Sequence, residues 1–139
     1  MGTVAQHFLA GAYSAGRATE HTAVYSPGSG EHLADLPAAT TADLDAAVAA
    51  ARTAFAEYAR WSVYERADLC HRVAALIERH ADRLARLTSA EQGKPLTEAR
   101  TDVEDSAALF ATSAEDAKRL YGETIPSTAR DKRMLTHRR

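Results

Sequence analysis

The stretch SAEQGKPLTEAR, residues 89–100, lies between two segments in which apolar residues recur at helical spacing. At its centre is the tripeptide Gly93-Lys94-Pro95. Glycine commonly ends a helix, and proline is tolerated in the first turn of the next one. A phosphate-binding loop would need an earlier glycine at position 88 and a hydroxyl residue directly after the lysine, but Thr88 and Pro95 stand there. The tripeptide therefore predicts a turn between two helices.

Helical spacing continues on both sides of this turn. Thr40 with Asp43, and Ser62 with Glu65, have the spacing of a capping box, in which two side chains cap the first turn of a helix. Apolar residues then follow at steps of three and four, so we expect one face of each helix to be buried. Aromatic residues at this spacing, with Trp61, are expected in the core. The expected helices span about residues 40–58, 62–77, 82–91 and 95–121, the last one ended by Gly122.

The first forty residues have a different pattern, with β-branched and aromatic residues in short groups. Ser26-Pro27-Gly28-Ser29-Gly30 separates two of these groups and has the composition of a tight turn. Short strands within residues 6–36 are therefore predicted. They are Gln6–Leu9, His21–Tyr25 and His32–Leu36.

Composition excludes several classes of protein. The 17 Lys+Arg and 19 Asp+Glu nearly balance, which gives no reason to expect nucleic acid or a membrane surface as partner. No apolar run approaches the roughly 20 residues of a membrane span. A single cysteine fits a reducing compartment, so we expect a cytoplasmic protein. The basic tail at 130–139 lacks the aromatic residues typical of nucleic-acid binding, and we interpret it as a solvated arm or subunit-contact strand.

The residues by themselves predict no complete active site. Cys70 is followed by His71, but adjacent helical side chains point about 100° apart, so a packed cysteine is the simpler interpretation. The six histidines show no metal-binding spacing. No catalytic residue can be assigned.

Five motifs, taken together, are more specific. In chain order they are YSPGSGEHLADLPAAT, DLDAAVAAARTAFAEYARWS, ERADLCHRVAALIERHADRLARL, AEQGKPLTEAR and AEDAKRLYGETIPS. From about Phe8 onward, the chain resembles the N-terminal part of the NAD(P)-dependent aldehyde dehydrogenases, with the succinate-semialdehyde dehydrogenases as the most similar branch. It departs from the family pattern at Ser26, where asparagine is usual.

This resemblance implies an α/β fold: the N-terminal part of the aldehyde dehydrogenase fold, with short hairpin strands, about four helices and an incomplete nucleotide-binding domain. Residues 1–123 would belong to the cofactor-binding domain, with strands in 6–36 and helices in 40–121. Residues 124–139 would begin an extended arm through which the family forms homo-oligomers.

The resemblance also implies the reaction: oxidation of an aldehyde, such as succinate semialdehyde, to a carboxylic acid with NAD or NADP. A cysteine thiolate forms a thiohemiacetal and then a thioester, which a glutamate-activated water hydrolyses. In the family these groups, and the nucleotide-binding motifs, follow the segment that this chain resembles. We therefore expect the chain to be inactive alone and to expose apolar helix faces that the remaining domain would cover.

A monovalent cation is also implied by the resemblance. Its ligands would be the Glu91 carboxylate and backbone carbonyls of Val24 and Tyr25, since hard cations favour oxygen. Two other roles remain open for Glu91, which could accept hydrogen bonds from the turn or pair with Lys94.

The fourth helix lines the substrate entrance in the family, so Thr101, Asp105 and Phe110 are candidates for lining a substrate tunnel. The alternative function is a non-enzymatic helical interaction module, whose apolar helix faces would bind a partner chain.

Overall fold

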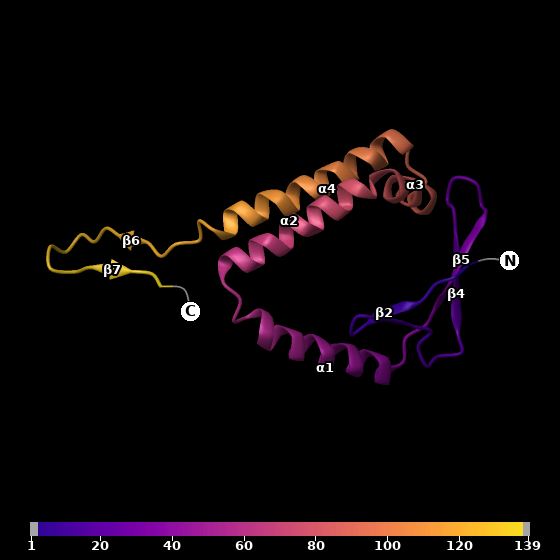
Figure 1. The fold of residues 1–139 in the computed structure, drawn as a ribbon, viewed down its shortest axis with the longest axis horizontal. Coiled ribbons are helices and arrows are strands. Elements are labelled where there is room, and N and C mark those ends of the chain that lie inside the picture. Colours follow the sequence, from indigo (N-terminus) through magenta and orange to yellow (C-terminus); the bar gives the residue numbers. More distant parts are fainter. Residues whose placement is uncertain (1–2, 138–139) are drawn as a thin grey trace.

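The computed structural model describes residues 3–137, so Arg138 and Arg139 of the basic tail lie outside the described residues. Short strands come first, four helices follow, and a small hairpin ends the described part (Figure 1). Helices α2 and α4 lie side by side, α3 lies at one end of this pair, and α1 lies apart from it (Figure 1). No helix in residues 3–137 is long and apolar enough to cross a membrane.

The N-terminal strands form two small sheets. β4 (His21–Tyr25) pairs antiparallel with β5 (His32–Pro37), and β1 (Thr3–Val4) pairs parallel with the other edge of β5. The two strands expected at these positions are therefore confirmed, β5 with one residue more, whereas β1 was not expected. Two residues are too few to show an alternating pattern, which explains this omission.

The second sheet is a hairpin of β2 (His7–Leu9) and β3 (Ala12–Ser14). Only its first strand was expected. Ala10 and Gly11 form the connection, with φ angles of 52° and 84°. Positive φ at both central residues is typical of a two-residue hairpin turn, but alanine is rare there, so the sequence carried no turn signal.

Both expected capping boxes are present. α1 (Thr41–Tyr58) begins after Thr40, and α2 (Val63–Arg79) begins after Ser62. The burial expected for α1 is wrong, because its apolar stripe is exposed: Phe55 is 67% exposed and Leu44 is 61% exposed. Val48, on the same stripe, is 45% exposed.

The turn expected at Gly93 is confirmed. α3 (Ala81–Gln92) ends there with Gly93 at φ 70°, and α4 (Leu96–Ala117) begins directly after Pro95. The end expected for α4 near Tyr121 is wrong by four residues, counting from Ala117. Gly122 serves the arm instead, because a Cβ there would collide with the carbonyl oxygen of Thr136.

The core is built from small residues where α2 and α4 meet. Its buried members are mostly alanines: Ala67 and Ala74 on α2, Ala85 on α3, and Ala99, Val103, Ala107 and Ala114 on α4. Alanine allows two helix backbones to approach closely, which leaves little room for rings. The expectation of an aromatic core is therefore wrong, although Trp61 is half-buried against Tyr58 with ring centroids 5.4 Å apart.

The last segment is the arm, which projects beyond the helices (Figure 1). It forms an antiparallel hairpin of β6 (Thr124–Ile125) and β7 (Met134–Leu135). The backbone N–H of Thr136 donates to the carbonyl of Glu123 over 2.9 Å. The arm is thus an extended hairpin on the side of the molecule away from the sheet.

Candidate functional site

Two turns meet where the sheet faces the helices. The turn between β4 and β5 is closed by Ser26, whose backbone carbonyl accepts from the N–H of Gly30 over 2.8 Å. The Ser26 hydroxyl accepts from the N–H of Ser29 over 3.4 Å, so serine can replace the usual asparagine in this turn. Gly93, in the turn between α3 and α4, packs against the ring of Pro27.

This contact brings together two of the three residues expected to bind a cation. Val24 and Glu91 line the same cavity of about 660 Å³, which lies between the sheet and α3. Tyr25 is not part of its lining and is exposed. The ladder between β4 and β5 is irregular between Val24 and Tyr25, where the register shifts by one residue. Such a bulge disrupts regular backbone pairing.

The cavity combines a carboxylate with apolar walls. Leu33, Leu36 and Leu87 contribute aliphatic side chains. Within residues 3–137, no group of three or more His, Cys, Asp or Glu side chains is arranged to hold a metal ion. A transition-metal centre is therefore not supported in the described part, whereas an alkali cation held by one carboxylate and backbone carbonyls needs no such group.

Lys94 is engaged elsewhere and does not pair with Glu91. Its ammonium forms an ion pair with Asp102 on α4. Its backbone carbonyl accepts from the Ser89 hydroxyl over 2.7 Å. The ion pair between Lys94 and Asp102 was not predicted from the sequence. The signal for it was only an acidic residue eight positions after the lysine.

The three residues expected to line a tunnel do not share one face of α4. Val103 is buried on the face packed into the core. At 3.6 residues per turn, Phe110 lies within about 20° of Val103, and Thr101 and Asp105 each lie about 160° from it. Thr101 and Asp105 are therefore together on the outer face, and Phe110 is on the inner one, where it is 39% exposed.

Among the hydrogen bonds and ion pairs of residues 3–137, none involves the Cys70 thiol. It is half-buried on α2, and the neighbouring His71 points to α4, where its Nε2 lies 2.9 Å from Glu115 Oε1. Hydrogen bonds from Lys118 and then His71 lower the pKa of Glu115. This cluster ties α2 to the end of α4 and leaves the cysteine outside it.

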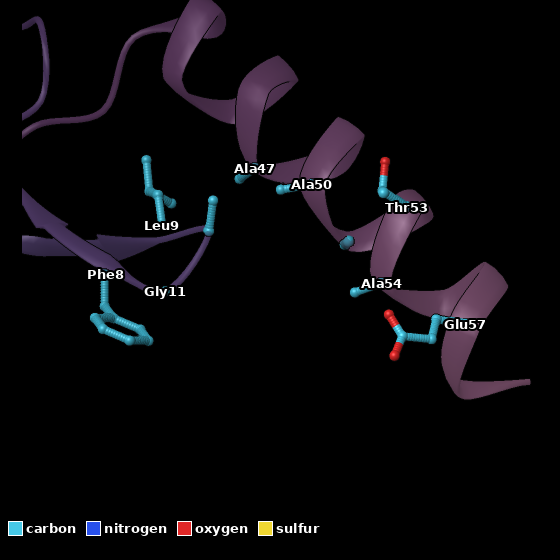
Figure 2. A pocket seen from close by; sticks show the side chains of 10 residues that line it. Phe8, Leu9, Gly11, Ala47, Ala50, Thr53, Ala54 and Glu57 are labelled. Carbon is cyan, nitrogen blue, oxygen red and sulfur yellow. The ribbon is translucent and has the colours of Figure 1, made fainter. Parts of the chain in front are cut away.

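A second cavity, of about 640 Å³, lies between the β2–β3 hairpin and α1. In Figure 2, Leu9 and Gly11 of the hairpin lie opposite Ala47, Ala50 and Ala54 of the helix. Thr53 and Glu57 are the polar residues at its edge. The other lining residues are apolar, so Glu57 is the one ionisable side chain in this lining.

Comparisons with known proteins agree with the motifs. A sequence model described as "Aldehyde dehydrogenase family" matches residues 13–139. A 3-sulfolactaldehyde dehydrogenase of Pseudomonas putida is 40% identical over 130 residues, which are 94% of this chain and 27% of that protein. A succinate-semialdehyde dehydrogenase [NADP(+)] of Escherichia coli strain K12 is 37% identical over 112 residues, 81% of this chain and 23% of that protein.

The fold is also found in solved structures. The crystal structure of succinate-semialdehyde dehydrogenase from Burkholderia pseudomallei matches with a TM-score of 0.83 and 31% identity, covering 94% of this chain and 27% of that chain. The fold predicted from the motifs is therefore confirmed. The chain spans about a quarter of the length of the relatives it matches.

Proposed function

Because the chain belongs to the aldehyde dehydrogenase family, we propose that it supplies one structural part of an enzyme that oxidises an aldehyde to a carboxylic acid with NAD or NADP. The family match over residues 13–139 carries this proposal. Succinate semialdehyde is the proposed substrate, since relatives are named for it. 3-Sulfolactaldehyde, named for another relative, likewise combines an aldehyde with an acidic group.

The reaction requires a cysteine thiolate, a stabilised oxyanion and a base. In such a reaction the thiolate would attack the aldehyde carbon and water would hydrolyse the thioester, and a nicotinamide cofactor, when bound, would supply the hydride acceptor for the oxidation between them. We propose that Cys70 is not this nucleophile, because it is half-buried on α2 and the adjacent His71 is paired with Glu115. We assign the catalytic and nucleotide-binding groups to the three quarters of the relatives' length that this chain does not match.

The role proposed for this chain is scaffolding. Its helices expose large apolar side chains, including Leu44, Val48 and Phe55 along one stripe of α1. A single stripe at helical spacing is typical of a face that packs against another element. The groove between α1 and the β2–β3 hairpin extends this apolar surface (Figure 2). We therefore propose that the remaining part of the nucleotide-binding domain, which this chain does not match, covers α1.

We propose that Glu91 and the backbone of Val24 and Tyr25 hold a monovalent cation. The residues fit such an ion in their chemistry, since a carboxylate and carbonyls are oxygen ligands. Two observations support the placement: Glu91 and Val24 line one cavity, and the register with β5 shifts between Val24 and Tyr25, opposite the unpaired Leu33. The ion pair of Lys94 with Asp102 keeps the lysine engaged away from Glu91. A bound cation would brace the sheet against α3.

The outer face of α4 is the proposed substrate-entrance face. Thr101 and Asp105 project from it together and are exposed. Phe110, on the inner face, would contact a tunnel only from the edge of the helix. The arm at 124–139 is the proposed homo-oligomer contact, and the projection of its β6–β7 hairpin beyond the helices supports this assignment (Figure 1).

A chimeric enzyme tests the proposed function. This chain replaces the matching segment of the Escherichia coli relative, and NADP reduction is measured with succinate semialdehyde. We expect a folded chimera with activity within about tenfold of the relative, because the chain contributes no catalytic group. The 139-residue chain alone should reduce no NADP.

The outcomes separate the two candidate functions. Aldehyde-dependent NADP reduction by the chain alone would show that catalytic groups have been misassigned. A folded chimera without activity, together with a chain that alone is monodisperse and unfolds sharply, would favour the helical interaction module.

A further inference from the structure

The contact between the two turns is unusually close at one residue. A Cβ added to Gly93 would lie 2.9 Å from Pro27 Cγ and 3.4 Å from the backbone nitrogen of Gly28. A Cβ atom is essentially never found nearer than about 3 Å to a heavy atom of a residue that is not its chain neighbour, because repulsion rises steeply there. Gly93 also has a φ of 70°, which glycine adopts without steric cost. Any other residue would force the Pro27 ring or one of the two turns to shift.

The proposed cation ligands lie close in sequence to the two residues that make this contact. Glu91 lies two residues before Gly93, in the last turn of α3. Val24 and Tyr25 end β4, and they lie three and two residues before Pro27. The carboxylate and the carbonyls thus belong to segments joined directly at the Gly93–Pro27 contact, and Val24 and Glu91 face one cavity.

Neither turn can easily yield to an added atom. Lys94 is held at two points. Its backbone carbonyl accepts a hydrogen bond from the Ser89 hydroxyl, and its ammonium pairs with the Asp102 carboxylate. The other turn is closed by hydrogen bonds of Ser26 to Glu31 and Gly30, each 2.8 Å long. A rigid body displacement of one turn is therefore the expected response to a Cβ at Gly93. Binding sites require their ligands to be placed within about 0.5 Å.

From this geometry we infer that Gly93 is a positioning residue for the cation site, because its missing Cβ lets α3 approach β4 closely enough for Glu91 and the β4 carbonyls to share one ion. The inference rests on the cation site proposed above and adds the device that assembles it. Gly93 then has two roles. It ends α3, and it sets the distance between the Glu91 carboxylate and the carbonyls of β4.

Thermal unfolding in different salts tests this inference. The 139-residue chain is unfolded in sodium, potassium and tetramethylammonium chloride at equal concentration, with helix content as the readout. Tetramethylammonium has the same charge but is too large for a site of this kind. The native chain should unfold about 3 °C or more higher in sodium or potassium, when that ion is at about ten times its dissociation constant. Gly93→Ala should lose this difference between salts.

Three variants make the result specific. Gly11→Ala introduces a similar backbone strain, since Gly11 has a φ of 84°, but an added Cβ meets no atom within 4 Å. It should lower the midpoint in every salt and keep the difference between salts. Glu91→Gln should abolish the difference. The double variant Pro27→Ala/Gly93→Ala removes the atom that the new Cβ would strike, and it should regain much of the difference.

The possible failures are distinguishable. If the native chain responds equally to all three salts, both the cation site and the inference are wrong. If the native response disappears in Glu91→Gln but persists in Gly93→Ala, the cation site stands and the positioning role is overturned. The assignment to an aldehyde dehydrogenase is tested separately by the chimera and is unaffected by either result.

Discussion

Asp43 shows how a single side chain holds the start of α1 in place. Its carboxylate accepts from the N–H and the hydroxyl of Thr40, over 3.0 and 2.7 Å, and from the N–H of Arg17 over 3.2 Å. It is only 6% exposed. The hydrogen bond from the Thr40 side chain, with further bonds from the Thr40 and Arg17 backbone, lowers the pKa of Asp43. The carboxylate thus joins the loop after β3 to the first turn of α1.

This lowered pKa predicts acid sensitivity. An unfolded aspartate has a pKa of about 3.9, so as pH falls below that value the unfolded chain takes up the proton first and unfolding is favoured. The stabilisation by Asp43 is present above about pH 4 and is lost as pH falls through the lower folded value. We expect Asp43→Asn to be less stable at pH 7 and to lose less stability between pH 5 and 2.5. Urea unfolding at several pH values measures this.

A second carboxylate of α1 provides the control. Asp45 is exposed, and Asp45→Asn is the matched variant that removes one negative charge from the same helix. An Asp43→Asn curve that runs parallel to the native one at every pH would contradict the assignment.

Site residues were predictable from the sequence only where the determining contacts are local. The Thr40–Asp43 capping box is a contact over three positions and was expected, whereas the link from Asp43 to Arg17 spans 26 positions and was not. Likewise the resemblance selected Glu91 and Val24, but only the fold shows that they share a cavity. Thr101, Asp105 and Phe110 were named together as tunnel residues from the family resemblance. Helical periodicity places Thr101 and Asp105 on one face of α4 and Phe110 on the other.

At the scale of elements, the pairing of α2 with α4 depends on alanine. Ala114 is 0% exposed at this interface, so extra atoms there have no free space. Ala114→Leu should lower the free energy of unfolding by about 1–3 kcal/mol, the usual cost of overpacking a filled core. Ala108→Leu is the matched control, because Ala108 is exposed on the same helix and leucine is nearly as good a helix former. Denaturant unfolding of both variants measures the difference, and equal stability would show that α2 and α4 pack less closely than described.

Element types followed from spacing and caps, but their ends and burial did not. Gly122 was expected to end α4, yet it is needed where the arm returns to Thr136, a contact over fourteen positions that no local signal reveals. The spacing located the apolar stripe on α1 correctly, but the stripe is exposed and not buried as expected. Periodicity identifies an apolar face without identifying the element that packs against it. β1 exists only through pairing with β5.

At the scale of the whole molecule, the chain buries small residues and exposes large ones. In the described part of the chain, the buried apolar residues are six alanines, Val103 and Pro37, whereas Phe8, Tyr13, Leu44, Phe55 and Leu109 are each at least 61% exposed. Ordinary cores contain the large aliphatic and aromatic side chains. The expectation of exposed apolar helix faces is therefore confirmed, and it is the structural basis for proposing that a larger domain covers α1.

The exposure of these large side chains predicts that one substitution affects stability little in the isolated chain and strongly in the chimera. Phe55 is 67% exposed in this chain, so Phe55→Ser should change the free energy of unfolding of the 139-residue chain by less than about 0.5 kcal/mol and reduce its binding of a hydrophobic dye. In the chimera with the Escherichia coli relative, the same ring should be buried, and its loss should cost about 3 kcal/mol. Ala46→Ser, on the opposite and exposed face of α1, should have little effect in the chain or in the chimera.

Urea unfolding of both proteins in parallel provides the measurement. An equally small effect of Phe55→Ser in the chimera would mean that the α1 stripe stays uncovered there, and the scaffolding role of this helix would have to be abandoned.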